Sequence, residues 1–372
     1  MAKKNKAFRF RIYPNKSQEE LFARTFGCCR FIYNRMLSDK IERYRKDKTM
    51  LRTTPASYKK EFPWLKEVDS LALCNVQLNL EKAYKNFFAR PETGFPKFKS
   101  KHHSAASYTT NFVNGNIRIE NGRLRLPKAG NVKIVCHREI PSEWKMKSVT
   151  IRREPTGKYY ASILCECEAV ENQDSFALPE EKNILGIDFA MHGLAVFSDG
   201  TTAGYPAYYR SAQDRLAREQ RRLSHCRKGS RNYEKQKKRV ALCHEKVKNQ
   251  RRDFHHKLSR TIADTHDVVA VEDLDMKAMS KGLHFGKSVM DNGYGMFLTL
   301  LGYKLEDRGK QLVKVNRFFP SSKRCSVCGR IRTDLTLADR VYRCSCGNIM
   351  NRDVNAAVNI RDEAYRLLSA SA

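Results

Sequence analysis

The sequence lacks any apolar run long enough to cross a membrane. No uninterrupted apolar stretch among its 372 residues approaches the roughly 20 residues that span a bilayer, so we expect no membrane-spanning segment and no membrane partner. The N-terminus also lacks the apolar h-region of a secretory signal, because Met-Ala-Lys-Lys-Asn-Lys leads straight into an alternating Phe/Arg segment. We therefore expect the protein to remain in the cytoplasm, where its twelve cysteines need not form disulfides.

Acidic residues are scarce relative to basic ones. Forty Asp and Glu stand against 71 Lys and Arg, which gives a formal net charge of +31 spread along the whole chain. Such a surplus repels itself without a counter-charge, so it indicates a polyanionic partner, and nucleic acid is the obvious one. We expect association with the nucleoid and an affinity for nucleic acid that falls steeply with salt. The alternative is a soluble protein that merely carries many lysines.

Basic residues concentrate in three segments. The N-terminal strand alternates Phe with Arg and so has one core face and one basic face. Residues 94–101 mix lysines with aromatics, a composition suited to phosphate contact and base stacking. Residues 211–264 form a basic helical region that we expect to break at Gly229-Ser230 into an antiparallel pair. A solvated charged face is the usual interpretation, but the excess of bases favours a groove that follows phosphates. The candidate nucleic-acid-binding residues are Arg9, Arg11, Lys97, Lys99, Lys101, Arg221, Arg222, Arg251 and Arg252.

Three acidic residues lie at the ends of apolar elements. Residues 184–200 predict a β-hairpin whose first strand ends in Asp188. Residues 268–272 predict a second buried strand, which ends in Glu272, and Asp353 lies in the first turn of a predicted helix. Each acid by itself is explained as a strand-end or helix-capping carboxylate, since Asp in a first turn suits the helix dipole.

Considered together, the three acids predict a metal site. Two strand ends and a helix start can converge in an α/β sheet, where three carboxylates repel each other unless cations lie between them. Two-metal phosphodiester cleavage needs such a cluster, with two Mg²⁺ or Mn²⁺ ions roughly 3.5–4 Å apart. We expect Asp188 to bridge the two ions, and Glu272 and Asp353 each to complete one of them.

Four cysteines near the C-terminus have the spacing of a zinc site. Cys325-x2-Cys328 is followed, after fifteen residues, by Cys344-x-Cys346, which predicts one structural Zn²⁺. The second pair has one intervening residue instead of two, so we expect Cys346 to be the weakest ligand. The alternative is four reduced core cysteines. The module directly precedes the Asp353 helix and should fix it in place.

The order of predicted elements divides the chain into an α/β multidomain protein. Residues 1–15 and 96–175 predict a small antiparallel barrel of the oligonucleotide-binding kind. Residues 16–95 predict a helical insertion between its strands. Residues 182–372 alternate strands and helices as an RNase H-like domain does, with residues 320–350 as its zinc-binding insertion.

Several motifs are more specific than these patterns. They are Phe10-Arg-Ile-Tyr-Pro14, Tyr84-Lys-Asn-Phe-Phe88, Gly94-Phe-Pro-Lys-Phe-Lys99, Gly186-Ile-Asp188, Val271-Glu272-Asp273-Leu274, and the segments 320–329 and 346–360. With these motifs nearly the whole chain resembles the TnpB (OrfB) proteins of insertion sequences, which are related to type V CRISPR effectors. The Cys-x-Cys spacing departs from the commoner family pattern, whereas the three acids match it fully.

The resemblance implies a specific architecture and activity. It implies a wedge barrel, a helical recognition domain and a RuvC nuclease domain with a zinc-ribbon insertion, over the ranges given above. It also implies RNA-guided cleavage of target DNA beside a short element-adjacent motif, with a guide RNA derived from the transposon end. Two alternatives stay open. One is an RNA-guided DNA-binding repressor, which the intact acids disfavour, and the other is a transposase that acts without guide RNA.

Overall fold

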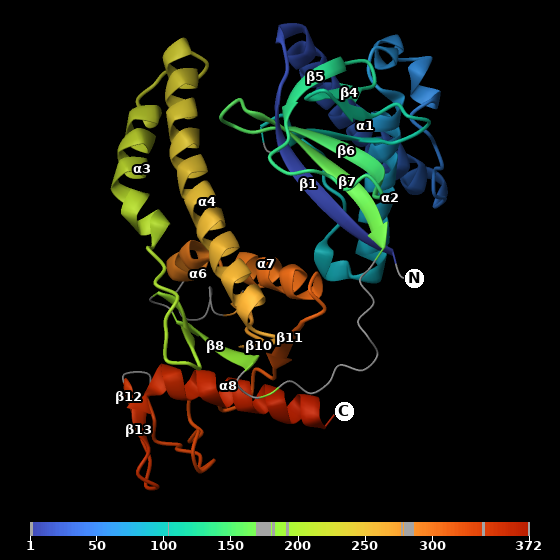
Figure 1. Cartoon of the computed structure of the whole chain (residues 1–372). Coiled ribbons are helices and arrows are strands. Elements are labelled where there is room, and N and C mark those ends of the chain that lie inside the picture. Colours follow the sequence, from blue (N-terminus) through green and yellow to red (C-terminus); the bar gives the residue numbers. More distant parts are fainter. Residues whose placement is uncertain are drawn as a thin grey trace. The chain divides into compact units, whose positions relative to one another are not determined.

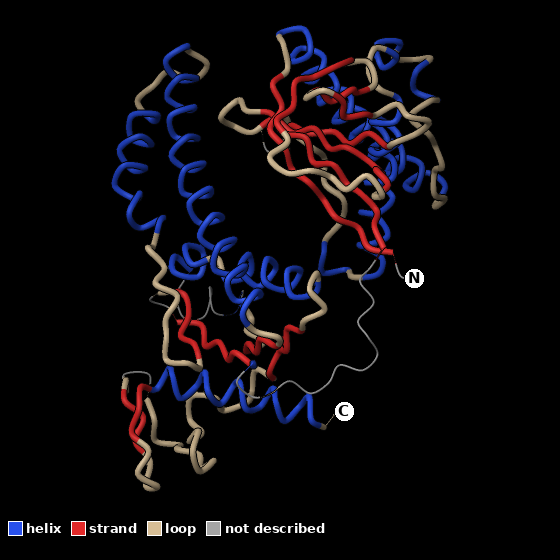
Figure 2. Tube along the Cα trace, viewed as in Figure 1, coloured by secondary structure: helices blue, strands red, loops and turns tan. Residues whose placement is uncertain are grey.

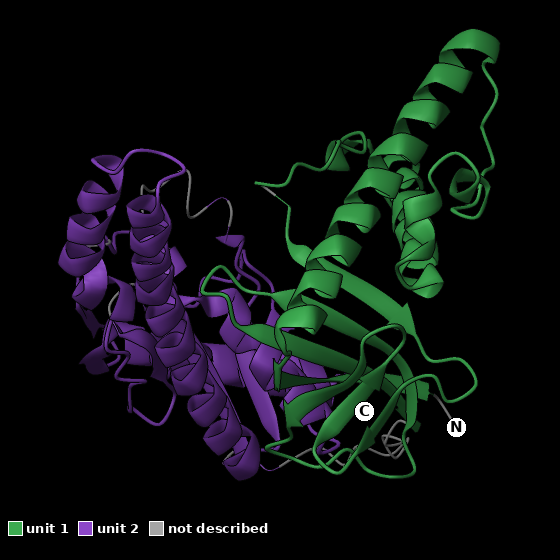
Figure 3. Ribbon diagram, turned by 90° about the horizontal axis from the view of Figure 1, so that it is seen from above, with its two compact units in different colours: residues 1–169 green, residues 170–372 purple. Residues whose placement is uncertain are grey.

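The computed structural model describes most of the chain, namely residues 3–102, 104–168, 180, 183–190, 193–276, 278, 286–336 and 339–370. The chain folds as two compact units, residues 1–169 and residues 170–372 (Figure 3). None of the helices in these ranges combines the length and the apolar character that crossing a membrane requires.

The first unit contains a seven-stranded antiparallel sheet (Figures 1 and 2). Its strands are β1 (Lys3–Tyr13), β2 (Ala106–Asn111), β3 (Arg118–Glu120), β4 (Arg123–Leu126), β5 (Gly130–Val135), β6 (Lys145–Arg153) and β7 (Tyr159–Glu168), in the spatial order β2-β6-β7-β1-β5-β4-β3. The N-terminal strand β1 lies near the middle and pairs with β5 and β7. Phe8, Phe10 and Ile12 on β1 are buried, as the alternation predicts.

The sheet of the first unit is open. Its ladder ends at β2 and β3, and no strand pair among the described residues joins these two strands. The sequence predicted a barrel, but β3 and β4 are only three and four residues long, and strands this short cannot continue the ladder around to β2. The predicted antiparallel β architecture is present as a curled sheet.

Two long helices pack against this sheet. They are α1 (Lys16–Asp47) and α2 (Ser70–Ala89), and three short 3-10 helices accompany them, at Ser57–Lys59, Pro63–Lys66 and Pro91–Thr93. On α1, the rings of Phe22 and Phe26 lie 6.0 Å from the ring of Tyr108 on β2. The helices and the strands therefore share one apolar core.

The second unit is organised around a four-stranded sheet in the order β11-β10-β8-β9. Its strands are β8 (Ile184–Ala190), β9 (Leu194–Phe197), β10 (Val268–Glu272) and β11 (Gln311–Val315). The predicted β8–β9 hairpin is confirmed as antiparallel, and β10 pairs in parallel with both β8 and β11. Parallel strands that are buried on both faces have continuous apolar sequences, which explains the sequence Val268-Val-Ala-Val271.

Helices cover both faces of this sheet (Figure 1). The helices that the structure describes in this unit are α3 (Tyr208–Ser224), α4 (Arg231–Thr265), α6 (Gly286–Asn292), α7 (Tyr294–Glu306) and α8 (Arg352–Ser369). Alternate strand residues such as Ile187 and Val271 share a core with Ile262 of α4 and Phe297 of α7. On the opposite face, Ala270 packs with residues of α8.

The basic region forms the predicted antiparallel pair, α3 and α4 (Figure 1). Gly229 adopts a φ of +82°, and the side chain of Ser230 caps α4 by accepting from the N–H of Tyr233 at 3.1 Å. A left-handed glycine followed by a serine N-cap ends one helix and begins the next.

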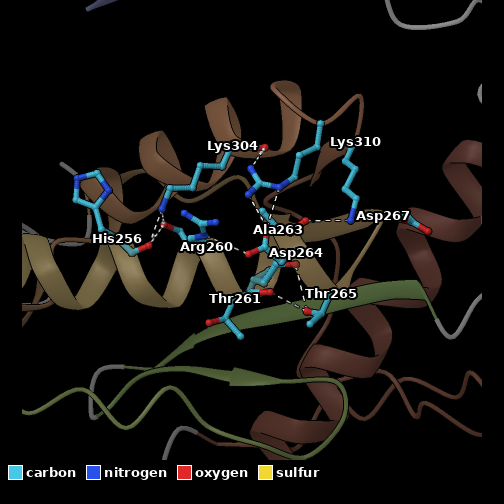
Figure 4. A network of polar contacts seen from close by, with 12 residues as sticks. His256, Arg260, Thr261, Ala263, Asp264, Thr265, Asp267, Lys304 and Lys310 are labelled. Carbon is cyan, nitrogen blue, oxygen red and sulfur yellow. Dashed lines mark hydrogen bonds and ion pairs between the residues drawn. The ribbon is translucent and has the colours of Figure 1, made fainter. Parts of the chain in front are cut away.

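A polar network attaches α7 to the second half of α4 (Figure 4). The ammonium group of Lys304 donates to the carbonyl of His256 at 2.6 Å and to the hydroxyl of Ser259 at 2.7 Å. Lys310, beyond the end of α7, donates to the carbonyl of Ala263 at 2.9 Å. Cations near a helix C-terminus satisfy its last carbonyls and oppose its dipole. The network therefore fixes the helix layer behind β10.

Candidate active site and cysteine metal centre

Strand alternation directs two of the predicted acids to the face of the sheet that α8 covers. Asp188 follows Gly186 by two positions on β8, and Glu272 follows Ala270 by two on β10; residues two apart share a face. Gly186 contacts the backbone of α8, and Ala270 belongs to the α8 core. Because Ala270 pairs with Gly186 in the parallel register, Glu272 lies level with Asp188, although β8 continues for two more residues to Ala190. Their acids therefore emerge side by side.

The third acid comes from the start of α8. Asn351 caps this helix, and its side chain accepts from the backbone N–H of Asp353 at 2.8 Å and of Val354 at 3.2 Å. Asp353 is thus in the first helical turn, as predicted. The guanidinium of Arg352 forms an ion pair with Asp353 at 3.2 Å. The carboxylate is therefore oriented by its own helix terminus and neighbour.

The three acids interact electrostatically. Burial raises the pKa of Asp188 to about 8, with further increases from the charges of Asp353 and Glu272, while Arg352 opposes the shift. Burial also raises the pKa of Glu272, although a hydrogen bond from Ser321 lowers it. Clustered carboxylates disfavour each other's ionisation until a cation joins them. The cluster thus has the electrostatic character of a cation site.

The ligand atoms of the acidic cluster are all carboxylate oxygens. Three carboxylates are hard oxygen ligands, which Mg²⁺ and Mn²⁺ prefer. The three acids do not form a group whose ligand atoms all lie within 4.8 Å; among the described residues only the four cysteines do.

The four cysteines converge at one point. The Sγ atoms of Cys325 and Cys346 are 3.7 Å apart, those of Cys328 and Cys344 are 3.6 Å apart, and all four lie within 4.8 Å of one another. Tetrahedral Zn²⁺ with bonds of about 2.3 Å has sulfur–sulfur edges of roughly 3.8 Å. Cys346 is inside the group despite its short spacing, because Gly347 turns the chain at a φ of +93°.

Backbone donors prepare Cys325 for a metal. Burial alone would raise the pKa of this thiol, but the N–H groups of Cys328 and Val327 and the amide of Asn348 lower it to about 6. Metals bind thiolates, not thiols. Gly329, with a φ of +75°, closes the turn by donating its N–H to the carbonyl of Cys325 at 2.9 Å.

Two buried asparagines connect the cysteine module to α8, and the sequence analysis missed them. The amide of Asn355 donates to the carbonyl of Arg324 at 2.7 Å, and its oxygen accepts from the N–H of Ser326 at 3.1 Å. One turn later, Asn359 donates to the carbonyls of Ser321 and Arg324 at 2.8 and 2.7 Å. Their signal is the four-residue spacing of two asparagines within an Ala/Val/Ile stripe. The module therefore holds the helix that carries Asp353, as expected.

The junction of α6 and α7 contacts the strand that carries Asp188, and this was also missed. Ala190 ends β8, two residues beyond Asp188. Its carbonyl accepts from the hydroxyl of Tyr294 at 2.5 Å and from the amide of Asn292 at 3.3 Å. Tyr294 is almost completely buried. Nothing in the local sequence pattern distinguishes it from an ordinary core aromatic.

The predicted nucleic-acid-binding residues of the first unit lie in two groups. Arg9 pairs with Glu154 at 2.6 Å and lies over the ring of Tyr160 at 4.0 Å. Arg11 also lies near the ring of Tyr160, at 5.2 Å. Lys99 lies 3.8 Å above the ring of Tyr33. The second group consists of Lys97, Lys99 and Lys101, and all three residues are exposed.

The predicted residues of α3 and α4 differ in exposure. Arg221, Arg222 and Arg252 are exposed. Arg251 is half-buried, and its guanidinium lies 4.0 Å from the buried carboxylate of Asp291. Three of these four side chains are therefore available at the surface, and Arg251 faces the interior.

Comparison with known proteins identifies the family. A family model described as "Probable transposase" (OrfB_IS605) matches residues 168–282, and one described as "Cas12f1-like, TNB domain" matches residues 294–360. A protein of Streptomyces pristinaespiralis named "Putative RNA-guided DNA endonuclease" is 32% identical over 97% of this chain and 89% of its own length. The chain belongs to the TnpB (OrfB) family. The similarly named InsQ of Escherichia coli K12 is 32% identical to this TnpB protein over 99% of this chain and 94% of its own.

Further matches agree with membership of the TnpB family. The CRISPR-associated endodeoxyribonuclease Cas12f1 of Sulfoacidibacillus thermotolerans is 25% identical over 62% of this chain and 56% of its own. The fold resembles a chain of a Cas12f1–sgRNA–target DNA complex, with a TM-score of 0.58 and 13% identity over 96% of this chain and 99% of that one. A helix-turn-helix model matches residues 1–49, although β1 and the single helix α1 occupy this segment.

Proposed function

We propose that this TnpB protein is an RNA-guided DNA endonuclease that cuts target DNA beside a short element-adjacent motif. The observation that carries the proposal is the placement of Asp188, Glu272 and Asp353 by two paired strands and a capped helix start, where burial and the other two acids raise the pKa of Asp188 to about 8. A cluster of carboxylates with this charge suits cations that act on a phosphodiester. Relatives that match nearly the whole chain bear the name RNA-guided DNA endonuclease.

We propose that these three acids would hold two Mg²⁺ or Mn²⁺ ions, with Asp188 serving both and Glu272 and Asp353 each serving one. When bound, the ions would activate water and stabilise the leaving oxygen. Neighbouring residues of the protein orient the carboxylates that would hold these ions. The cap from Asn351 orients Asp353, and Ser321 lies 3.5 Å from the Glu272 carboxylate. Zn²⁺ in the four-cysteine site would keep α8, and with it Asp353, in position.

The domain assignment follows from the same proposal. We assign residues 1–15 and 96–175 to a wedge domain, residues 16–95 to a recognition domain, and residues 182–372 to a RuvC-like nuclease domain with the cysteine module at 320–350. The exposed basic residues would bind phosphates of a guide RNA, derived from the transposon end, and of the target DNA. Base pairing by the guide would then supply sequence choice.

The test is to co-express the protein with its native locus and to sequence the RNA that co-purifies. We expect one dominant RNA, and we expect cleavage to follow the sequence at its end when that end is rewritten. Asp188→Asn should abolish cleavage in Mg²⁺ and leave RNA binding intact. Asp199→Asn is a matched control, because Asp199 is exposed in a turn.

Three results would contradict the proposal, each in its own way. RNA-free protein that cuts the same target equally well indicates a conventional nuclease. Guided binding without cleavage by the wild-type protein indicates a repressor. Strand transfer without RNA indicates a transposase.

A further inference from the structure

Phe318 is an unusually exposed aromatic residue. At 85%, its relative exposure is the highest among the large apolar side chains of the described residues. It lies in the loop between β11 and the cysteine module. Its neighbour Phe319 is turned inward and packs against the core that Ala270 and Val315 form with α8. The loop thus presents Phe318 to solvent and turns the next residue, Phe319, inward.

The loop that carries Phe318 is anchored on both sides to the end of β10. Before it, the guanidinium of Arg317 pairs with Asp273, the residue after Glu272, at 2.8 Å. After it, the hydroxyl of Ser321 lies 3.5 Å from a carboxylate oxygen of Glu272. Phe318 is three residues from Ser321, and three residues of extended chain span at most about 11 Å. Phe318 therefore lies at the rim of the acidic site.

The backbone at Phe318 is ordered by local hydrogen bonds. Its N–H donates to the side chain of Asn316 at 2.9 Å, the pattern by which asparagine stabilises a turn. The N–H of Phe319 donates to the carbonyl of Asn316 at 2.9 Å. The exposed ring therefore belongs to a formed turn and not to a frayed end.

The charge near Phe318 in the sequence favours one chemical class of ligand. Between Asp307 and Asp334 the sequence contains eight lysines or arginines and no acidic residue. A membrane or protein partner would require a wider apolar patch than one ring. Single-stranded nucleic acid requires cations for its phosphates and aromatic faces for its bases. Five of these eight cations pair with acids, namely Arg308, Lys310, Lys314, Arg317 and Arg332. The other three, Lys323, Arg324 and Arg330, are exposed and would supply the phosphate contacts, and Phe318 would supply the aromatic face.

The geometry points to Phe318 as a stacking platform for an unpaired nucleobase of the DNA strand that enters the acidic site. This inference rests on the proposed function. Ions held by the carboxylates would bind the scissile phosphate, whereas the neighbouring bases need an attachment of their own. Stacking provides it without reading sequence, because every base has a π-face.

The first test measures stacking directly and without cleavage. In an Asp188→Ala background, a Phe318→Trp variant loaded with guide RNA is titrated with a short single-stranded oligodeoxynucleotide. We expect tryptophan emission to be quenched beyond the change in the same background with Phe318, which corrects for Trp64 and Trp144. Unchanged emission at saturating oligonucleotide would overturn the inference.

The second test uses cleavage of a guide-matched target. Stacking contributes about 1–3 kcal/mol per base, so Phe318→Ala should reduce kcat/KM for cleavage by roughly 5- to 150-fold. Phe318→Tyr should restore it, and the unfolding temperature and target binding should not change. Ile349→Ala is the control, because Ile349 is also an exposed apolar residue, at 60%.

The two failures are distinguishable. Wild-type cleavage that persists undiminished in Phe318→Ala rejects the stacking role and leaves the proposed nuclease intact. A wild-type complex that cuts no DNA rejects the nuclease, whatever the emission of the Phe318→Trp variant shows.

Discussion

The α-carbon of Gly186 lies so close to the carbonyl oxygen of Ala357 that no side chain fits between them. A Cβ at residue 186 would overlap this oxygen and approach the backbone nitrogen of Arg361 to 2.9 Å. The contact joins β8 to α8, two elements that are far apart in sequence. It therefore fixes the distance between Asp188, two residues further along β8, and Asp353, near the start of α8.

The first prediction is that Gly186→Ala separates these two elements. Backbone cannot move aside as a flexible side chain does, so we expect a loss of at least about 3 kcal/mol in the stability of the second unit, together with loss of cleavage. Thermal unfolding and a cleavage assay measure the two effects. Gly295→Ala is the control, since nothing lies within 4 Å of a Cβ at that helical position. Equal stability of both variants would contradict the close packing.

The second prediction concerns the metal of the cysteine module. Purified, reduced protein should contain about one zinc, measured by elemental analysis. Cys346→Ser should lose zinc and destabilise the C-terminal part as much as Cys325→Ser does, because both sulfurs belong to the same group. This replaces the milder effect that the Cys-x-Cys spacing predicts. Cys74→Ser, which changes an exposed cysteine elsewhere, should retain zinc, and zinc-free native protein would refute the assignment.

The sequence predicts those parts of the site that depend on local patterns. Asp188 and Glu272 end apolar runs, and Asp353 follows the helix cap of Asn351, so each could be located from its neighbours. The cysteines were located by spacing alone. The contact of Gly186 with α8 could not be predicted, because it depends on how two distant elements pack.

The fold, too, could be predicted where it depends on local patterns and not where it depends on the packing of distant elements. The strands, the helix pair α3–α4 and the parallel pairing around β10 follow from periodicity and turn residues. Closure of the first sheet does not, because alternation gives the faces of a strand but not the partners of β2 and β3. Periodicity likewise gave no indication that Arg251 faces the interior, since its partner Asp291 comes from another helix.

The third prediction is that the side chain of Asp291, a residue of α6, caps the N-terminus of α3. Ala207 begins this helix without a side-chain cap, and the carboxylate of buried Asp291 instead accepts from the N–H groups of Tyr209 at 2.9 Å and Arg210 at 3.1 Å. Asp291→Ala leaves these donors without their acceptor and removes the carboxylate that lies 4.0 Å from the guanidinium of Arg251. We expect a loss of about 2–4 kcal/mol and faster hydrogen exchange at residues 209 and 210.

The control for Asp291→Ala is Asp253→Ala. Asp253 forms an exposed ion pair with Lys257 on α4, and such pairs contribute about 0–1 kcal/mol. If hydrogen exchange at the start of α3 is the same in both variants, Asp291 does not act as its cap.

The fourth prediction is a loss of stability in mild acid through His255. This residue is completely buried, and burial, opposed in part by the backbone of Asn292, lowers its pKa from 6.5 to about 4. As pH falls, the unfolded chain takes up the proton first. The stability that neutral His255 contributes is therefore complete above pH 6.5 and disappears as pH falls towards 4. The linkage amounts to about 2 kcal/mol at pH 5.

The measurement is the shift in unfolding temperature between pH 7 and pH 5. His255→Leu removes the titrating group, so its shift should be smaller than that of the wild type, even if the variant is less stable at pH 7. His244→Leu, at an exposed position of the same helix, should keep the wild-type shift, because it leaves the buried His255 unchanged. Equal shifts in all three proteins would mean that His255 keeps an ordinary pKa in the folded protein.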